Sequence, residues 1–500
     1  MHELLQVVAP ALGDRSVITD ADGPLTAEEL DAGAARIGAW LSSTDARQLA
    51  LVDVNSRTVP LALFGASHAG VPFTPVNYRL ADDRLRALLA RTAPSIAVLG
   101  AGVAERVGEI DGVQMVSRQE FLAIAEHGDV DAAEPDERSS IAVLLFTSGT
   151  TGEPKAAILE HDNLTSYVLA TVEFAGSDDD EATVVSVPPY HIAGVSAILT
   201  AMFAGRRIVY LESFEPAAWV TAVIDEKVTH AMVVPTMLGR ILDELDRRGV
   251  GLPDLRTLSY GGGPMPLPVV ERALAMLPHV AFVNAYGLTE TASTISILGP
   301  EDHRLAFESS DPAVRRRLAS VGRALPSVEL TIRDPEGELV GPNQQGEVWV
   351  RGSQVSGHYV GRDDDDNDGW FRTRDAGNFD DDGFLYLHGR LDDVIVRGGE
   401  NLSPGEIESV IIEHPAVEAC AVVGVPDAEW GERVVAAVVA RPAAEVTEDE
   451  LRDFVRAQLR STKTPERIQF RDELPMNETG KLLRRVLRDE LAVAFASGRS

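Results

Sequence analysis

Short apolar runs alternate with amphipathic stretches through the first two thirds of the chain. The apolar runs have the length and the flanking turn residues of buried strands, and the amphipathic stretches have helical periodicity. Strands that alternate with helices predict parallel sheets covered by helices on both faces. The expected strands are Leu49–Val54, Ser95–Leu99, Ile141–Phe146, Thr183–Val187, His230–Val234, Thr257–Tyr260 and Val280–Asn284, and the expected helices include Pro60–Ala69, Asp82–Arg91, Pro216–Glu226 and Thr236–Arg248.

The pattern changes after about residue 320, where strand-like segments follow one another with only short turns between them. This spacing is typical of antiparallel sheets, and it predicts a smaller β unit beside the α/β sheets. The segments are Glu329–Arg333, Gln345–Arg351 and Phe384–His388.

A third region begins near Leu391, with two helical and two strand-like segments in about 110 residues, enough to fold alone. We therefore predict an α/β chain with a large N-terminal domain over residues 1–391. It comprises two parallel-type α/β sheets and the antiparallel β subdomain. A small α+β C-terminal domain follows over residues 392–500, with helices at Pro404–Ile412 and Asp449–Leu459 and strands at Ala416–Val423 and Val434–Ala440.

Composition and charge exclude several classes of protein. The formal net charge is −33, which argues against a nucleic-acid partner and against an anionic membrane surface. The single cysteine, Cys420, forms no intrachain disulfide and fits a reducing cytoplasm, where we expect the protein. The first residues lack the pattern of a signal peptide, and no apolar run approaches the ~20 residues that cross a bilayer.

Lysine is rare in this chain. Only Lys155, Lys227, Lys463 and Lys481 are present among 45 Lys and Arg residues. Because arginine fills nearly every other basic position, a remaining lysine is more often present for its compact ammonium group. Lys227 matches no motif, and we interpret it as a surface residue.

One lysine ends a loop suited to a polyphosphate. The expected strand Ile141–Phe146 runs directly into Thr147–Lys155, which has two glycines, four hydroxyl side chains and the lysine. Successive backbone N–H groups in such a turn form an anion-binding concavity. The loop is not a Walker P-loop, because Glu153 and Pro154 separate the second glycine from the lysine.

Thr147–Lys155 closely resembles the phosphate loop of the adenylate-forming superfamily, which includes acyl- and aryl-CoA synthetases, peptide-synthetase adenylation domains and firefly luciferase. Five further segments resemble motifs of that superfamily, in the same order, along nearly the whole chain. They are Pro189–Gly194, Asn284–Glu290, Thr373–Gly377, Gly389–Asp393 and Asn477–Lys481. Six ordered matches identify the chain as a member, with the pattern of acyl- or fatty-acid–CoA ligases.

The resemblance implies that ATP activates a carboxylic acid as an acyl-adenylate, with release of pyrophosphate. The implied catalytic residues are Lys481, which bridges the acid and the α-phosphate, Thr289, Glu290 and His191. Thr289 and Glu290 are also the implied Mg²⁺ site, and oxygen ligands suit that ion. The implied ATP-binding residues are Thr147, Ser148, Gly149, Thr150, Thr151, Gly152, Lys155, Gly261, Gly262, Ala285, Tyr286, Gly287, Asp375 and Arg390.

Within this set, Tyr286 resembles the residue that stacks on adenine, Asp375 the ribose ligand, and Arg390 a ribose or phosphate contact. Two positions depart from the family. Arg374 stands where glycine is usual, and Ala156 stands where glycine usually follows the loop lysine.

The implied acyl pocket comprises His191, Val195, Pro235, Thr236, Met237 and Tyr260. The segment Pro188–His191 carries no acidic residue to pair with the ammonium group of an amino acid, and a buried unpaired ammonium is costly. We therefore expect an uncharged acyl tail and favour a fatty or other hydrophobic acid, which points to lipid metabolism.

Asp392, Gly398 and Gly399 resemble the hinge and following loop of CoA ligases. The resemblance implies that the C-terminal domain is mobile, and that it rotates after adenylation so that the CoA thiol accepts the acyl group. Two alternatives remain open: an acyl-AMP ligase that loads a carrier-protein thiol, and a catalytically silent nucleotide-binding relative. A homodimer is compatible with the sequence.

Overall fold

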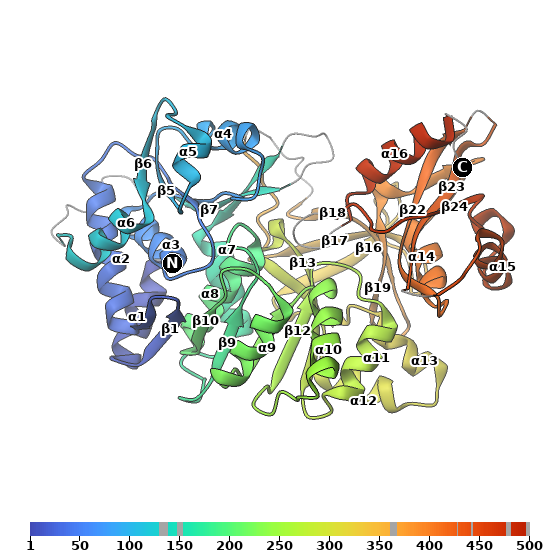
Figure 1. Ribbon diagram of the computed structural model, residues 1–500, viewed down its shortest axis with the longest axis horizontal. Coiled ribbons are helices and arrows are strands. Elements are labelled where there is room, and N and C mark those ends of the chain that lie inside the picture. Colours follow the sequence, from blue (N-terminus) through green and yellow to red (C-terminus); the bar gives the residue numbers. More distant parts are fainter. Residues whose placement is uncertain are drawn as a thin grey trace.

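The computed structural model describes residues 1–129, 139–147, 154–360, 368–427, 429–441, 444–476 and 482–496, except for the side chains of residues 401, 495 and 496. The strands of these residues form four sheets (Figure 1). Two large sheets lie in the N-terminal part, and the C-terminal sheet, in orange and red, stands at the opposite end of the molecule.

The six-stranded sheet contains, in spatial order, β6 (Val113–Ser117), β5 (Ser95–Leu99), β3 (Leu49–Val52), β4 (Phe73–Pro75), β7 (Ile141–Thr147) and β8 (Lys155–Glu160). All adjacent pairs are parallel except β7 and β8, which form an antiparallel hairpin at one edge. The strand β3 is buried on both faces, which explains why it reads as a continuous apolar run.

The nine-stranded sheet contains β15 (Arg323–Ala324), β14 (Ser293–Leu298), β13 (Ala281–Leu288), β12 (Thr257–Gly261), β11 (His230–Val233), β9 (Ala182–Val185), β10 (Arg207–Tyr210), β1 (Ser16–Asp20) and β2 (Gly23–Thr26) in that order. The strands from β13 to β1 are parallel, and antiparallel strands flank them on both sides.

Helices cover both large sheets. One hydrophobic core lies between the two sheets and includes α1, α2, α3, α6, α7 and α8. The other face of the six-stranded sheet is covered by α4 and α5. The other face of the nine-stranded sheet is covered by α9, α10 and α11. The bounds are α1 (His2–Leu12), α2 (Ala27–Ser42), α3 (Thr58–Ala69), α4 (Asp82–Ala90), α5 (Val103–Val107), α6 (Arg118–His127), α7 (His161–Thr171), α8 (Ile192–Ala204), α9 (Pro216–Asp225), α10 (Pro235–Arg248), α11 (Leu267–Met276), α12 (Pro300–Glu308) and α13 (Pro312–Arg315).

Four antiparallel strands form the third sheet, β16 (Val328–Arg333), β17 (Gly346–Gly352), β18 (Phe371–Phe379) and β19 (Leu385–Arg390). The C-terminal sheet contains β20 (Ile395–Arg397), β21 (Glu400–Leu402), β22 (Val417–Asp427), β23 (Gly431–Ala440) and β24 (Arg467–Phe470). Helices α14 (Pro404–Ile412) and α15 (Glu448–Gln458) cover one face of it, and α16 (Arg484–Ala496) covers the other. Short 3₁₀ turns are η1 (Thr289–Thr291), η2 (Arg316–Ala319), η3 (Leu391–Asp393) and η4 (Ser461–Lys463).

The predicted fold class is confirmed, with two corrections that bear on the site. The strand β13 continues to Leu288 instead of ending at Asn284, so Tyr286 lies in a strand. The strand β18 was not predicted, because its polar residues hide the alternation of a half-buried strand. The domain boundary near residue 391 stays a prediction.

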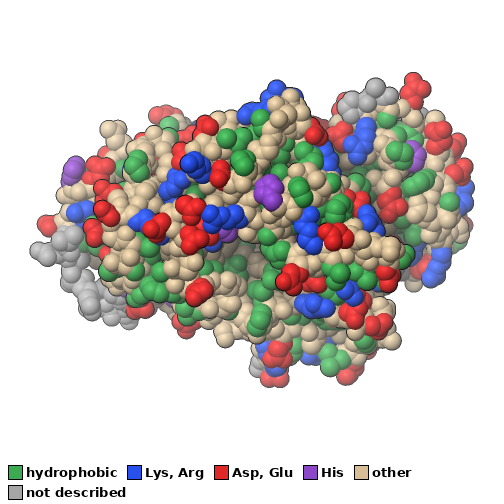
Figure 2. Space-filling view, turned by 90° about the horizontal axis from the view of Figure 1, so that it is seen from below, with side chains coloured by type: hydrophobic (Ala, Val, Ile, Leu, Met, Phe, Trp, Pro, Cys, Tyr) green, Lys and Arg blue, Asp and Glu red, His purple; other side chains and the backbone are tan. Residues whose placement is uncertain are grey.

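The charged side chains do not gather on one side of the face shown in Figure 2, where acidic and basic groups are interspersed. Lys227 is exposed, as its interpretation as a surface residue requires. Among the residues that the structure describes, no helix has both the length and the apolar character to cross a membrane.

Candidate active site

The two ends of the phosphate loop are fixed by the β7–β8 hairpin. Thr147 and Lys155 are paired across it, and a guanidinium N–H of Arg91 donates to the carbonyl of Pro154 at 2.7 Å. The same guanidinium lies 5.0 Å from the ring centroid of Phe146. Five of the predicted ATP-binding residues fall outside the described residues: Ser148, Gly149, Thr150, Thr151 and Gly152.

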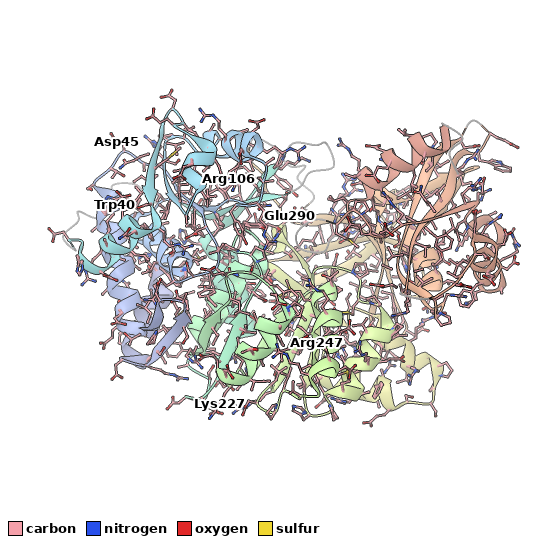
Figure 3. All side chains as sticks on the ribbon, in the orientation of Figure 1. Trp40, Asp45, Arg106, Lys227, Arg247 and Glu290 are labelled. Atoms are coloured by element: carbon pink, nitrogen blue, oxygen red, sulfur yellow. The ribbon has the colours of Figure 1, made fainter. Side chains whose placement is uncertain are left out.

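Glu290 lies near the middle of the molecule, between the N-terminal sheets and the C-terminal domain (Figure 3). It occupies η1 beside Thr289 and is only 8% exposed. Its carboxylate accepts a hydrogen bond from the hydroxyl of Tyr359. The ring of Tyr359 in turn lies 5.8 Å from the ammonium group of Lys155. The structure therefore links the predicted metal ligand to the phosphate-loop lysine.

Tyr286, Asp375 and Arg390 form a second group of predicted site residues. The Tyr286 hydroxyl donates to Asp375 Oδ2 at 2.6 Å, and Arg390 Nη1 donates to Asp375 Oδ1 at 3.0 Å. Arg390 also donates to the carbonyl of Thr373 at 2.9 Å. One buried carboxylate, supplied by β18, thus fixes side chains from β13 and β19.

The electrostatics of this group are coupled. Burial and the Asp375 carboxylate hold the pKa of Tyr286 well above its ordinary value, so the phenol stays a neutral donor. Burial disfavours the charge on Arg390, but Asp375 and Glu290 outweigh it and raise the pKa of the guanidinium. Arg390 therefore interacts electrostatically with a carboxylate of each group of site residues.

Arg374 adopts the left-handed backbone conformation that the family's glycine would favour. Its φ is +62°, which is strained for a residue with a side chain. The backbone is held there by the buried carboxylate of Glu347, which accepts from the Arg374 N–H at 3.1 Å and from Arg372 Nε at 2.9 Å. The departure from glycine is therefore accommodated without loss of the neighbouring Asp375 contacts.

Two of the predicted ATP-binding glycines allow close approach between adjacent strands. A Cβ on Gly261 would lie 2.2 Å from the carbonyl oxygen of Ala285, its partner in β13. A Cβ on Gly287 would lie 1.7 Å from the carbonyl oxygen of Ser293, where the β13–β14 register shifts. Main-chain packing accounts for both glycines, and their contact with ATP stays a prediction, as does that of Gly262.

The predicted acyl-pocket residues differ in accessibility. His191 is partly buried at the N-terminus of α8, with its ring 4.7 Å from that of Tyr190. Val195 and Met237 are buried, whereas Pro235 is half-buried and Thr236 is exposed. Their role in binding an acid stays a prediction.

Tyr260 lies deeper in the core than a pocket wall requires, and its role in binding an acid stays a prediction. Its side chain is 1% exposed and packs in the core between the nine-stranded sheet and α10 and α11. Its hydroxyl donates to His303 Nε2 at 2.8 Å, and His303 Nδ1 donates to the Gly299 carbonyl at 2.8 Å.

The hinge residues lie where the antiparallel sheet meets the C-terminal domain. Asp392 occupies η3, and Gly398 and Gly399 form the turn between β20 and β21 with φ of +57° and +83°. Across the hinge, the Ser403 hydroxyl donates to the carbonyl of His388 at 2.5 Å. Lys481 lies outside the described residues, so its role stays a prediction.

Tyr359 contacts the predicted site residue Glu290, and Glu347 binds the backbone next to Asp375, two contacts that the sequence did not reveal. Tyr359 follows β17 in a segment without strand or helix periodicity, and its partner Glu290 lies 69 positions away. Glu347 occupies an alternating strand pattern, where an acid normally indicates a solvent-facing position. No local signal in the sequence distinguishes either residue.

The residues present fit Mg²⁺ bound together with a nucleotide. No group of three or more His, Cys, Asp or Glu residues capable of holding a metal occurs in the part of the chain that the structure describes. Glu290 nevertheless offers a buried carboxylate, and its neighbour in η1, Thr289, carries a hydroxyl. Mg²⁺ commonly takes one or two protein oxygens and completes its shell with phosphate and water, which this pair allows.

The sequence matches the AMP-binding enzyme family over residues 5–360 and the AMP-binding enzyme C-terminal domain over residues 406–481. It is 32% identical over 478 residues to feruloyl-CoA synthase from Amycolatopsis sp, covering 93% of each chain. It is 34% identical over 447 residues to the fatty acid–[acyl-carrier-protein] ligase ScoC of Streptomyces coeruleorubidus, covering 85% of this chain and 83% of ScoC.

The fold is also shared with a solved ligase structure. O-succinylbenzoate coenzyme A synthetase from Bacillus subtilis, in complex with ATP and magnesium ion, superimposes with a TM-score of 0.82 at 27% identity. The match covers 97% of this chain and 99% of that one. The chain therefore belongs to the AMP-binding enzyme family: it is an AMP-forming acid–thiol ligase, and ATP, Mg²⁺ and CoA are the cofactors of that class.

Proposed function

We propose that this ligase converts a hydrophobic carboxylic acid, with fatty acids as the favoured class, to an acyl-adenylate and then to an acyl-CoA thioester. The observation that carries this proposal is the buried Asp375 carboxylate, fixed by Tyr286 and Arg390 within the electrostatic reach of Glu290. Each oxygen of the Asp375 carboxylate accepts one of these two hydrogen bonds and has a second lone pair. The remaining lone pairs can accept hydrogen bonds from the two ribose hydroxyls of ATP.

In the first step, a carboxylate oxygen of the acid attacks the α-phosphorus of ATP, and the bond from that phosphorus to the β-phosphate oxygen breaks. Lys155 and the N–H groups of its loop bind the departing pyrophosphate. Glu290 and Thr289 would hold the magnesium, which would neutralise phosphate charge when bound. Lys481 bridges the two reacting anions, so that the protein aligns the reactants and offsets their repulsion.

In the second step, the thiol sulfur of CoA attacks the acyl carbon, and AMP leaves with the electrons of the acyl–phosphate bond. The thiol proton passes to solvent. The hinge at Asp392 allows the C-terminal domain to replace Lys481 with the turn at Gly398 and Gly399, which lines the path of the thiol. Lys481 is therefore needed for the first step only.

The surroundings of His191 support the proposal of an uncharged acyl tail. The ring centroid of Tyr190 lies 4.7 Å from that of His191 and 5.7 Å from that of Tyr78, and Val195 follows on α8. None of these side chains carries an acid that would pair with a substrate ammonium group. An uncharged hydrophobic tail binds such a site without leaving a buried charge unpaired.

A carrier-protein thiol is the second candidate acceptor, because one of the relatives with the same span is a fatty acid–[acyl-carrier-protein] ligase. The net charge of −33 does not distinguish the two acceptors, because CoA is itself a polyanion. CoA is the favoured acceptor on the CoA-ligase form of the hinge.

The test is a panel of fatty, aromatic and amino acids incubated with enzyme, ATP and Mg²⁺, with CoA, with a carrier protein, or with neither. Acid-dependent ATP–pyrophosphate exchange measures the first step, and mass spectrometry of the thioester measures the second. The proposal expects exchange with hydrophobic acids and thioester with CoA. Acyl-AMP formation without acyl-CoA would overturn the CoA assignment, and absence of exchange with every acid would overturn activation.

A further inference from the structure

We propose that Tyr359 is a positioning residue that holds the metal carboxylate Glu290 and the phosphate-loop lysine Lys155 in one preformed arrangement before ATP and magnesium bind. The inference rests on the proposed function for the roles of Glu290 and Lys155. It adds a third residue, from a different part of the chain, that acts through both of them.

The contacts of Tyr359 reach the two residues at different points of its side chain. Its hydroxyl donates to Glu290 Oε1, and its ring lies 5.8 Å from the Nζ atom of Lys155. A cation within about 6 Å of a ring centroid is attracted by the ring's quadrupole. One side chain therefore contacts both Glu290, the predicted magnesium ligand, and Lys155, the predicted phosphate-binding lysine.

The main chain around Tyr359 is independently anchored. We call residues 356–360 the connecting segment. The N–H groups of Ser356 and Gly357 donate to the carbonyl of Glu290 at 2.9 and 3.2 Å. At the other end of the connecting segment, the Val360 N–H donates at 3.0 Å to the carbonyl of Ala156, the residue after Lys155. A further bond of 3.0 Å runs from the Ile158 N–H to the carbonyl of His358.

The connecting segment therefore joins η1 to β8 through its backbone, whatever side chain residue 359 carries. This separation matters for the test, because a change of side chain leaves the anchoring bonds in place. Removing the hydroxyl alone, as in Tyr359→Phe, deletes the bond to Glu290 and keeps the ring beside Lys155.

The physical role of the hydroxyl follows from the burial of Glu290. A carboxylate that is 8% exposed is costly unless it is hydrogen-bonded, and the Tyr359 hydroxyl supplies such a bond. The bond also selects one orientation of the carboxylate. Partners that orient a metal ligand in this way typically contribute about 10- to 100-fold to metal affinity.

The experiment compares the full-length wild type with Tyr359→Phe and Tyr359→Leu. Calorimetry measures Mg²⁺ binding to the enzyme saturated with α,β-methylene-ATP, and nucleotide binding in EDTA without metal. Neither measurement requires the acid to be known or turnover to occur. Tyr386→Phe is the matched control, because Tyr386 also donates to an acid, Asp380, but outside the site.

For Tyr359→Phe we expect Mg²⁺ affinity to fall about tenfold or more, with metal-free nucleotide affinity unchanged. For Tyr359→Leu we expect the same loss and, in addition, about two- to fivefold weaker metal-free nucleotide binding, because Lys155 loses the ring. The control should match the wild type in both measurements.

Unchanged Mg²⁺ affinity in Tyr359→Phe, in a variant that unfolds at the wild-type midpoint, would overturn the positioning role and leave the proposed function intact. Equal metal-free nucleotide binding in the Phe and Leu variants would overturn the part concerning Lys155. A wild type that binds no nucleotide would overturn the proposed function, and this inference with it.

Discussion

The hydroxyl of Tyr286 donates a hydrogen bond of 2.6 Å to the carboxylate of Asp375, which lies 89 positions further along the chain. Arg390 binds the other oxygen of the same carboxylate at 3.0 Å. A side chain expected to face adenine and one expected to face ribose are therefore already tied to each other. The proposed nucleotide site is built around a carboxylate that the protein's own donors hold in place.

Asp375→Asn should raise the KM for ATP about 10- to 100-fold and leave the KM for the acid nearly unchanged. The amide keeps the shape but loses the charge and one acceptor, and hydrogen bonds to a charged group contribute about 1.5–3 kcal/mol. Acid-dependent ATP–pyrophosphate exchange measures both constants. Asp380→Asn is the control, since Asp380 caps a turn in the same subdomain, and equal ATP affinity in both variants would contradict the assignment.

Arg374→Gly should raise the stability of the protein by up to about 1.5 kcal/mol. A side chain at φ +62° costs about 1–2 kcal/mol, and the greater chain entropy of unfolded glycine offsets about 0.5–1 kcal/mol of that gain. Urea unfolding measures the change. Arg374→Ala serves as the control, because it removes the guanidinium but keeps the strained backbone. A glycine variant no more stable than the alanine variant would show that the strain has no energetic effect.

Lys481→Ala should separate the two half-reactions. Exchange between ATP and pyrophosphate should fall by orders of magnitude, because the ammonium that offsets repulsion between acid and α-phosphate is lost. Thioester formation from supplied acyl-AMP and CoA should persist at close to the wild-type rate. Lys463→Ala is the matched lysine control, since Lys463 binds Glu406 at 2.6 Å within the C-terminal domain. An equal loss of both half-reactions in Lys481→Ala would contradict the rotation of the domain.

His303 should make the protein sensitive to acid. Burial lowers the pKa of His303 from 6.5 to about 4, so the folded protein keeps the ring neutral where the unfolded chain binds a proton. Its contribution to stability is therefore complete above pH 6.5 and is lost as the pH falls towards 4, by up to about 3 kcal/mol. Unfolding midpoints measured between pH 7 and 4 should fall less steeply in His303→Gln.

Part of the slope should remain in that variant, because burial also lowers the pKa of His230 to about 4. His127→Gln is the control, since the ring of His127 is exposed and its replacement should leave the slope unchanged. A slope in His303→Gln equal to that of the wild type would show that the buried histidine does not govern the acid response.

The sequence alone was enough to predict the alternation of strands and helices, because burial on one or two faces leaves a local periodic pattern. It also predicted a phosphate loop, adenine and ribose segments and a hinge, each of which is a short contiguous motif. The element that the sequence pattern did not predict, β18, was missed for a local reason. The strand β18 carries Arg372, Arg374 and Asp375, whose charges hide its half-buried alternation.

Only the tertiary structure decided which of these residues meet. Tyr359 reaches Glu290 across 69 positions and Tyr286 reaches Asp375 across 89, and both pairings depend on how separate sheets pack. The same packing turned Tyr260 into the core, towards His303, although its neighbour Gly261 belongs to a predicted nucleotide-binding segment. The local pattern of apolar and polar residues predicts which segments form strands. The partner of each side chain depends on the register and packing of strands that are distant in the chain.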